Sequence, residues 1–165
     1  MEVYLVQHGE SKSESEDPAR SLTDKGWKDV ESVSGHLADL GIEVAQIFHS
    51  GKLRAKQTAE VFAQYLMPPR GIVEQEGIGP LDDPHKAKAI ISQAEEPCMI
   101  VGHLPHLKKL ASLLILGEPE KEVVNFRMGG AVCLTKSGES WSIEWALVPL
   151  LARQTGQRGS RKKRE

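Results

Sequence analysis

The segment Val3-Tyr4-Leu5-Val6-Gln7-His8-Gly9 begins with four consecutive apolar residues and ends in a histidine and a glycine. A short apolar run of this kind predicts a strand that is buried on both faces, as central strands of a parallel sheet are. His8 then lies at the carboxyl end of the strand, the edge of an open α/β sheet where ligands bind. Gly9 allows a tight turn and a close approach of backbone N–H groups to a ligand. On this segment alone, a histidine satisfied by a turn is the more common interpretation, so the case for a functional His8 depends on the rest of the chain.

The composition is that of one globular domain. The chain has 165 residues, 39% of them apolar, which is enough for a sizeable core. No apolar run approaches the roughly 18 residues that a membrane-spanning helix needs, and the start carries no basic segment followed by an apolar one. We therefore expect a cytoplasmic protein that does not enter a membrane. Cys98 and Cys133 lie in apolar runs and match no metal or redox spacing, so we expect both to be reduced core residues.

The net charge of −2 conceals a basic carboxyl end. Residues 153–165 carry a net charge of +5, whereas the remaining residues carry −7. Because this end is basic, contains glycine and has no apolar periodicity, we expect residues 151–165 to be a disordered tail after a domain that spans residues 1–150. A solvated tail is favoured over nucleic-acid binding, and we assign the tail no function.

Strand and helix signals alternate along most of the chain. The expected strands cover residues 3–6, 44–48, 72–74 and 98–101. The expected helices begin after Thr23, at Leu53, after Asp83 and after Pro105. Residues 131–135 and 141–148, joined by 136–139, predict an antiparallel hairpin. Since parallel neighbours need crossover connections, we predict an α/β three-layer sandwich with a mostly parallel central sheet, helices on both faces and a C-terminal antiparallel hairpin.

Histidines follow three of the expected strands, as His8, His49-Ser50 and His103. Because parallel strands point the same way, these side chains should gather along one edge of the sheet. Arg54 stands in the first turn of the helix after the second strand, where backbone N–H groups point outward and the helix dipole favours an anion. A guanidinium can hold phosphate oxygens in bidentate fashion, and His103 can add a donor. Arg20 could close over the same oxygens, so the pattern predicts a phosphate site.

Four segments resemble, in order and spacing, the histidine phosphatase superfamily: Gln7-His8-Gly9-Glu10-Ser11, Arg20-Ser21-Leu22-Thr23-Asp24-Lys25-Gly26, Ser50-Gly51-Lys52-Leu53-Arg54-Ala55-Lys56-Gln57-Thr58 and Val101-Gly102-His103-Leu104-Pro105. The compact length is similar to that of the SixA-type phosphohistidine phosphatase branch, and the resemblance covers residues 1–148. It implies a phosphoglycerate mutase-like fold and an enzyme that needs no metal or other cofactor. It also implies His8 as the nucleophile, Arg54 as a phosphate clamp and His103 as the second histidine of the pocket.

The resemblance further implies covalent catalysis in two steps, in which neutral His8 attacks phosphorus and water then hydrolyses the phosphohistidine. A backbone carbonyl near Gly9 could hold the proton of the other ring nitrogen. The residues expected to bind substrate are Gln7, Gly9, Ser11, Arg20 and Ser50.

Two features depart from the family pattern. Gln7 stands where the family has an arginine, and because charge-assisted hydrogen bonds are roughly twice as strong as neutral ones, we expect a weak pocket. The loop Gly77-Ile78-Gly79-Pro80 has no acid where many members place the group that protonates the leaving group. Glu76, Asp82 and Asp83 lie nearby, but we expect surface and capping roles for them. A phosphohistidine substrate would explain the missing acid, because its imidazole leaves more readily than an alkoxide.

Two alternatives that share the phosphate site stay open. A phosphate- or phosphohistidine-binding protein that has lost turnover through Gln7 would bind phosphate without hydrolysing it. A phosphatase or mutase for small phosphoesters would use the same first step, although this short chain has no insertions to enclose a small substrate. The length leaves the pocket mouth open, which favours a phosphorylated protein as the partner.

A metal site is the least favoured alternative. Imidazole suits zinc, and the candidate ligands would be histidines 8, 49, 103 and 106. Pro105 and the helix start should point His106 away from His103, and no carboxylate recurs beside these histidines. We therefore expect His106 at the rim of the pocket or facing solvent.

Overall fold

The computed structural model describes residues 1–153, and in this part of the chain one six-stranded sheet carries four helices. The strands are β1 (Glu2–Gln7), β2 (Gln46–His49), β3 (Ile72–Glu74), β4 (Cys98–Gly102), β5 (Ala131–Ser137) and β6 (Ser140–Leu147). The helices are α1 (Asp24–Asp39), α2 (Leu53–Leu66), α3 (Pro84–Gln93) and α4 (His106–Leu116). Most of the expected basic tail, residues 154–165, lies outside the described residues.

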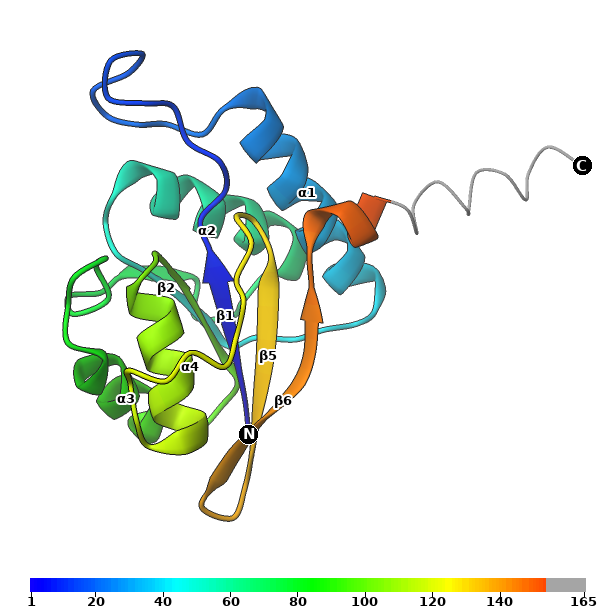
Figure 1. The fold of residues 1–165 in the computed structure, drawn as a ribbon. Coiled ribbons are helices and arrows are strands. Elements are labelled where there is room, and N and C mark those ends of the chain that lie inside the picture. Colours follow the sequence, from blue (N-terminus) through cyan, green and yellow to red (C-terminus); the bar gives the residue numbers. More distant parts are fainter. Residues whose placement is uncertain (154–165) are drawn as a thin grey trace, which may run out of the picture.

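The strands lie in the order β3-β2-β4-β1-β5-β6 (Figure 1). β3, β2, β4 and β1 are parallel to one another. β5 runs antiparallel to β1, and β6 antiparallel to β5. The predicted α/β class, mostly parallel sheet and C-terminal hairpin are therefore confirmed. β1 is a central strand, which explains the uninterrupted apolar run at its start.

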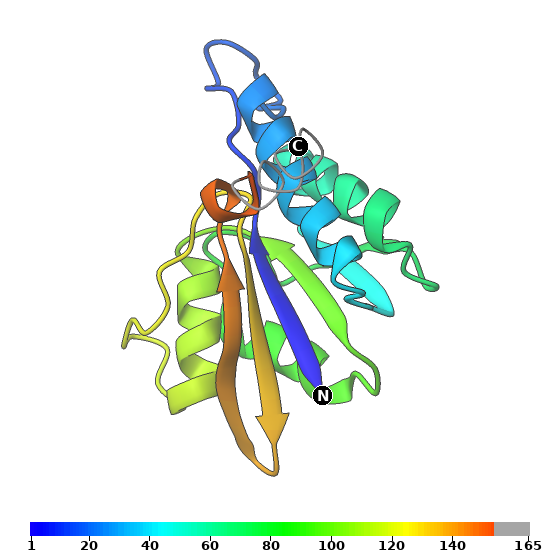
Figure 2. The ribbon, with the colours of Figure 1, turned by 90° about the vertical axis from the view of Figure 1, so that its right-hand side faces the viewer.

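The two faces of the sheet bury separate apolar clusters, with α1 and α2 on one side and α3 and α4 on the other (Figure 2). Alternate residues of β1 serve the two clusters, because successive side chains of a strand point to opposite faces. Tyr4 and Val6 pack with α1 and α2, whereas Val3 and Leu5 pack with α3 and α4. The predicted three layers are present. Because helices cover both faces of the sheet, the site lies at the edge of the sheet.

Helix ends follow local signals in the sequence. The Thr23 side chain accepts a hydrogen bond from the backbone N–H of Gly26 (3.0 Å), which caps α1. Gly41 follows α1 with a positive φ of 73°, a conformation that favours glycine. Asp83 caps α3 by accepting from the backbone N–H of His85 (3.0 Å). These caps place α1 and α3 directly after the loops that approach the carboxyl edge of the sheet.

The hairpin turn is tighter than predicted. The sequence predicts a connection over residues 136–139, but pairing continues through Lys136↔Trp141 and Ser137↔Ser140. Only Gly138 and Glu139 remain in the turn, and Gly138 has a φ of 61°. Two-residue hairpin turns need positive φ values, which glycine adopts without strain.

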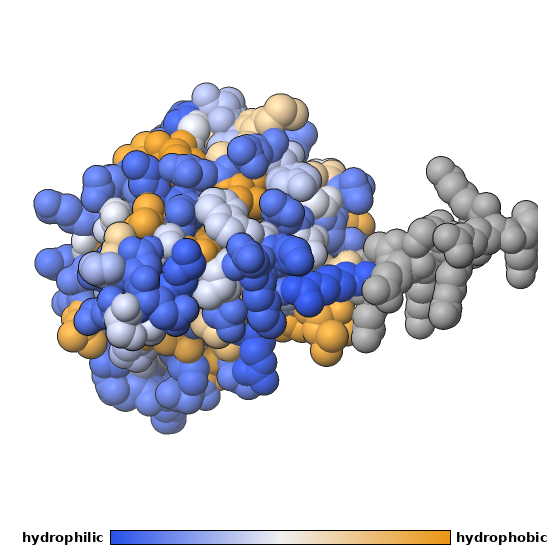
Figure 3. All heavy atoms as spheres, turned by 90° about the horizontal axis from the view of Figure 1, so that it is seen from above, coloured by the Kyte–Doolittle hydropathy of each residue, from blue (hydrophilic) through white to orange (hydrophobic). Residues whose placement is uncertain are grey.

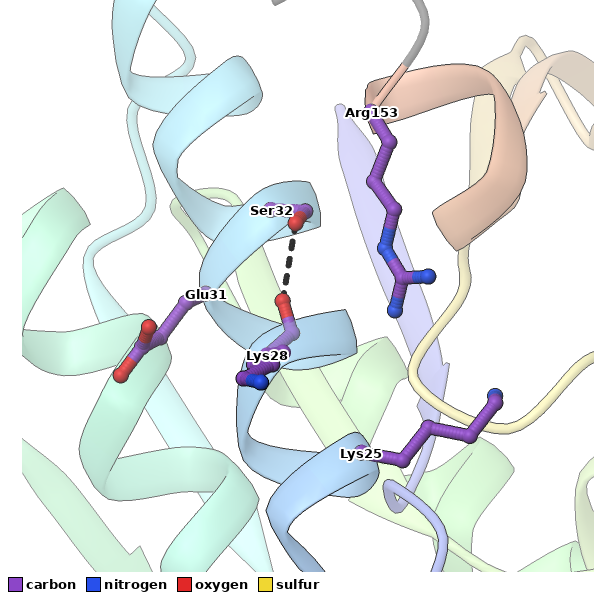
Figure 4. Close-up of a pocket in the computed structure, with 5 residues that line it drawn as sticks. All are labelled: Lys25, Lys28, Glu31, Ser32 and Arg153. Atoms are coloured by element: carbon purple, nitrogen blue, oxygen red, sulfur yellow. Dashed lines mark hydrogen bonds between the residues drawn. The ribbon is translucent and has the colours of Figure 1, made fainter.

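The expected start of the tail at residue 151 is wrong, because residues 149–153 form a helical turn. Ala152 is 5% exposed and packs in the cluster under α1 and α2. Arg153 forms an ion pair with the buried carboxylate of Asp29, whose other oxygen pairs with Lys25 Nζ at 2.7 Å. In Figure 4 the side chains of Arg153 and Lys25 approach the same hollow beside α1, from the turn and from the helix. Apolar burial of Ala152 and this ion pair tie residues 152 and 153, which the sequence assigned to the tail, to the rest of the domain.

Cys98 and Cys133 are unbridged and buried, as expected, and burial raises the pKa of each thiol to about 11. Within residues 1–153, no helix has the length and apolar character that crossing a membrane requires.

Candidate active site

The carboxyl edge of the parallel strands brings together the side chains that the sequence pattern selected. β2, β4 and β1 are neighbours, so His8, Ser50 and His103 leave the sheet side by side. The backbone N–H of His8 donates to the carbonyl of Gly102 (3.0 Å), which links the ends of β1 and β4. The ring centroids of His8 and His103 lie 5.0 Å apart. The predicted convergence at one edge is present in the structure.

His8 is held with one nitrogen engaged and the other available. Its Nδ1 lies 2.7 Å from the carbonyl oxygen of Gly9, and because a carbonyl can only accept, Nδ1 carries the proton and donates. Nε2 therefore has its lone pair free, and no described residue hydrogen bonds to it. Burial, first, and then the nearby charges of Arg54 and Arg20 lower the pKa of His8 to about 4, against the opposing effect of the Gly9 hydrogen bond. The ring is neutral near pH 7, in the tautomer that a nucleophile needs.

Gly9 is required by close packing rather than by its backbone angles. A Cβ at this position would lie 2.9 Å from Val30 Cγ2 and 3.1 Å from the carbonyl oxygen of Gly26. The Gly9 N–H donates to Thr58 Oγ1 (3.0 Å), and the Thr58 hydroxyl donates to the carbonyl of Arg54 (2.8 Å). The loop that orients His8 is thus fixed to both α1 and α2.

Two guanidiniums face the same space. Arg54 lies in the first turn of α2, and its buried Nε has no hydrogen-bond partner among residues 1–153. Arg20 adopts a positive φ of 53° and donates to the carbonyl of Lys12 and the hydroxyl of Ser11, each at 3.3 Å. Burial and then Arg20 lower the pKa of Arg54, while Glu14 opposes the shift. Two cations that destabilise each other beside a helix N-terminus favour an anion between them.

His103 closes the other side of the pocket. It is 1% exposed, and its Nε2 lies 2.6 Å from Ser50 Oγ. Burial, followed by His8 and Arg54, lowers its pKa to about 3. His103 is therefore neutral near pH 7 rather than a cation. Its buried Nδ1 has no hydrogen-bond partner among the described residues.

The remaining predicted contacts lie around this pocket. Gln7 is 9% exposed, and its Oε1 is buried without a hydrogen-bond partner in residues 1–153. Its backbone carbonyl accepts from the N–H of Gly129 (2.9 Å), just before β5. Ser11 pairs with Leu22 in an isolated bridge and holds Arg20 through its hydroxyl. Ser11 thus reaches the pocket through Arg20.

The nearby carboxylates of the loop before α3 are occupied in local structure. Asp82 accepts from the backbone N–H of Gly79 (2.8 Å). Asp83 caps α3 and also contacts His85 Nδ1 at 2.8 Å. Glu76 is exposed. The capping role expected for Asp83 is confirmed, and Asp82 orders its own loop.

His106 differs from its prediction. The sequence analysis placed it at the pocket rim or facing solvent, but it is 0% exposed, and neither ring nitrogen has a hydrogen-bond partner among the described residues. Helix α4 is buried on most sides, through His106, Leu107, Leu110, Ala111, Ser112, Leu113 and Leu114. In its first turn Lys108 and Lys109 lie on the partly exposed side, whereas His106 and Leu107 face the interior. His49 is buried near the pocket, as expected, and its Nδ1 accepts from the N–H of Gly51 (3.0 Å).

Sequence reasoning missed two structural roles in α2. Gln57 Oε1 accepts from the backbone N–H of Leu22 (2.8 Å), which ties the Arg20 loop to the helix. Thr58 supports the His8 loop, as described above. Both residues stand in the quoted segment 50–58, and polar side chains one turn after Arg54 were the available signal.

A groove of about 730 Å³ lies beside Ser50, and it is lined by Ser50, Gly51, Lys52, residues 75–77, residues 79–82 and Lys86. Seen from the carboxyl edge, the surface is mostly hydrophilic and its apolar patches are separate (Figure 3). Of the predicted site residues, Ser50 lines this groove. Within residues 1–153, no three His, Cys, Asp or Glu side chains are grouped so that they could hold a metal ion.

Comparison with known proteins points to one family. Residues 3–76 match the histidine phosphatase superfamily (branch 1). The chain is 30% identical to an uncharacterized protein of Picosynechococcus over 81% of this chain and 84% of that protein. It is 23% identical to phosphohistidine phosphatase SixA of Escherichia coli, over 90% of this chain and 94% of that protein.

The fold is similar to solved structures of the same group. The structure of the protein histidine phosphatase SixA complexed with tungstate matches with a TM-score of 0.81 at 21% identity, over 92% of this chain and 99% of that one. A phosphoglycerate mutase from Bacillus anthracis matches with a TM-score of 0.70 at 11% identity, over 93% and 96% of the two chains. The chain belongs to the histidine phosphatase superfamily, and its architecture is SixA-like.

Proposed function

We propose that this protein is a phosphatase that transfers a phosphoryl group to Nε2 of His8 and then to water, and that its substrate is a phosphohistidine on another protein. One observation carries the proposal. The hydrogen bond from His8 Nδ1 to the Gly9 carbonyl leaves the Nε2 lone pair free in a ring that burial keeps neutral. A neutral imidazole held in this way is an activated nucleophile.

The chemistry needs two displacements at phosphorus. In the first, a bond forms between His8 Nε2 and phosphorus while the bond from phosphorus to the leaving group breaks. In the second, a water oxygen attacks phosphorus, the bond to Nε2 breaks and inorganic phosphate leaves. The charges of Arg54 and Arg20 act on His8, and His103 lies beside it, so these three side chains are the expected donors to the equatorial oxygens, where charge accumulates in both transition states.

The surroundings of the pocket favour a nitrogen leaving group. Asp82 and Asp83 are engaged in hydrogen bonds of their own loop and helix cap, so neither is held ready to protonate an alkoxide. The imidazole of a phosphohistidine leaves more readily. SixA, to which the chain is similar, is named for that activity. The groove beside Ser50 offers space for a side chain presented by a partner protein.

A comparison of substrates and variants tests this function. The wild type, His8→Ala and the exposed control His85→Ala would be mixed with a phosphohistidine protein and with para-nitrophenyl phosphate. We expect faster hydrolysis of the phosphohistidine, a loss of about a thousandfold or more in His8→Ala and no loss in His85→Ala. Turnover that survives His8→Ala unchanged would overturn the mechanism, and preference for the ester would overturn the substrate.

A second candidate function is phosphate or phosphohistidine binding without turnover. The observation that favours it is the neutral Gln7, whose buried Oε1 is an acceptor that no described donor meets. This candidate predicts vanadate binding with no measurable hydrolysis by the wild type. Gln7→Arg would then restore hydrolysis, whereas Gln7→Met, which removes the amide, would not. Measurable hydrolysis by the wild type decides against this candidate.

A further inference from the structure

Ser50 makes a short contact to the pocket histidine that phosphate binding alone does not explain. Its Oγ lies 2.6 Å from His103 Nε2, and within residues 1–153 this is the only hydrogen bond to the His103 ring. Ser50 also lines the groove described above. Ser50 therefore contacts His103 with its hydroxyl and also forms part of the groove wall.

The turn that carries Ser50 is held on both sides. The Gly51 N–H donates to His49 Nδ1 (3.0 Å), and Gly51 has a φ of 87°. The carboxylate of Glu74 occupies the space that a Cβ at residue 51 would need. The neighbouring strand thus fixes the turn after β2, and with it the direction of the Ser50 side chain.

The surroundings of His103 decide which ring nitrogen carries the proton. Its Nδ1 is buried and lacks a partner among the described residues. A buried N–H without an acceptor is rare and costly, whereas an unfilled lone pair is tolerated better. The proton of the neutral ring therefore belongs on Nε2, which donates to Ser50 Oγ. The Lys52 backbone N–H also approaches this oxygen, at 3.4 Å.

We propose that Ser50 is a positioning residue that holds His103 in the Nε2–H tautomer, so that the ring presents a donor beside the phosphoryl site. When the substrate arrives, a phosphoryl oxygen shares this N–H with Ser50 Oγ, and the ring keeps its tautomer. The proposal deepens the function above and rests on it for its kinetic part. It assigns Ser50 an action through His103, in addition to any contact of its own with substrate.

Kinetics of two variants at this position test the assignment. Ser50→Ala removes the acceptor, whereas Ser50→Thr keeps it. The matched control is Ser92→Ala, because Ser92 is an exposed serine on α3 whose hydroxyl donates to the Lys88 carbonyl (2.8 Å). Since a neutral hydrogen bond is worth about 0.5–1.5 kcal/mol, we expect kcat to fall roughly twofold to tenfold in Ser50→Ala. KM should change less, Ser50→Thr should recover most of kcat, and Ser92→Ala should match the wild type. An unchanged kcat in Ser50→Ala, or a loss in Ser50→Thr as large as that in Ser50→Ala, overturns the proposal.

A second readout does not depend on turnover. Nitrogen NMR of ¹⁵N-histidine-labelled protein reports the tautomer of each ring, and His103→Asn assigns the signals of His103. We expect the Nε2–H form in the wild type and in Ser50→Thr, and a mixture of tautomers in Ser50→Ala. An Nδ1–H form in the wild type, or identical spectra in all three proteins, overturns the proposal. If the wild type releases no phosphate from any substrate, the proposed function fails, but this spectrum still decides the role of Ser50.

Discussion

The parallel and antiparallel parts of the sheet differ in what they contribute. β1, β2 and β4 each end beside a residue of the candidate site, namely His8, Ser50 and His103. The hairpin of β5 and β6 contributes buried apolar residues and, just before β5, the Gly129 N–H that holds the Gln7 carbonyl (2.9 Å). Both parts belong to one sheet, so being in the sheet does not decide where the candidate site lies. The direction of the strands decides it.

Helix placement explains this difference. α2 begins at Leu53, four residues after the end of β2, and α4 begins at His106, four residues after the end of β4. Each parallel strand therefore delivers the chain to a helix N-terminus, where unpaired backbone N–H groups and the helix dipole favour an anion. The hairpin connects two strands by a two-residue turn and creates no such helix end. The comparison predicts that substitutions at the parallel edge change the rate, whereas those in the hairpin change stability.

The largest effect should come from Arg54→Ala at the parallel edge. Removing one preorganised donor to transition-state charge typically costs about a hundredfold to a thousandfold in rate, and Arg54 meets that description. We expect a loss of this size in kcat/KM with little change in the free energy of unfolding. Arg70→Ala is the control, because Arg70 forms an exposed ion pair with Glu96 (3.2 Å) away from the pocket. A loss of kcat/KM below tenfold, or one no larger than in Arg70→Ala, would show that Arg54 does not stabilise the charge of the transition state.

Leu134→Ala in β5 should have the opposite signature. Leu134 is 0% exposed in the cluster under α3 and α4, and truncating a buried leucine costs about 2–5 kcal/mol. We expect urea denaturation to show that loss, while kcat and KM of the remaining folded enzyme stay near wild type. Ile143→Ala in β6, where the side chain is 46% exposed, should cost much less. If the hairpin shaped the site directly, the folded fraction of Leu134→Ala would instead have a changed KM or kcat.

Acid should weaken the fold through the histidines of the parallel edge. Burial lowers the pKa of His8 to about 4 and that of His103 to about 3, so the unfolded rings bind protons below about pH 6.5 while the folded rings stay neutral. The free energy of unfolding should therefore fall as the pH drops from 6.5 towards 4, by at most about 1.4 kcal/mol per pH unit for each ring. Urea denaturation at several pH values measures this slope. His8→Ala should reduce it, and an equal slope in both proteins would contradict the shifted pKa.

The sequence was informative where a local pattern determines structure. The apolar run of β1, the Thr23 cap and the Asp83-Pro84 start of α3 each predicted an element that the structure contains. The meeting of His8, Ser50 and His103 followed from one further rule, that parallel strands end at the same edge. These inferences needed no knowledge of which strands are neighbours.

Non-local geometry set the limits of prediction. His106 was expected at the pocket rim or facing solvent because Pro105 and the helix start should point it away from His103, yet α4 is buried on most sides and takes the ring into the interior. The packing of residues 152 and 153 was not predicted because the ion pair from Arg153 to Asp29 joins residues far apart in the sequence. The contact between Ser50 and His103 depends on the register of β2 with β4, which no local pattern encodes.

The most direct test of the account is to trap the phosphorylated enzyme. The protein would be mixed with a phosphohistidine protein, quenched in alkali within milliseconds to seconds, and analysed by peptide mapping and ³¹P NMR, because phosphohistidine survives base. The account predicts a phosphoryl group on Nε2 of His8, and none in His8→Ala. A phosphoryl group on Nδ1 of His8 or on another residue, or hydrolysis with no phosphoenzyme at any time point, would contradict it.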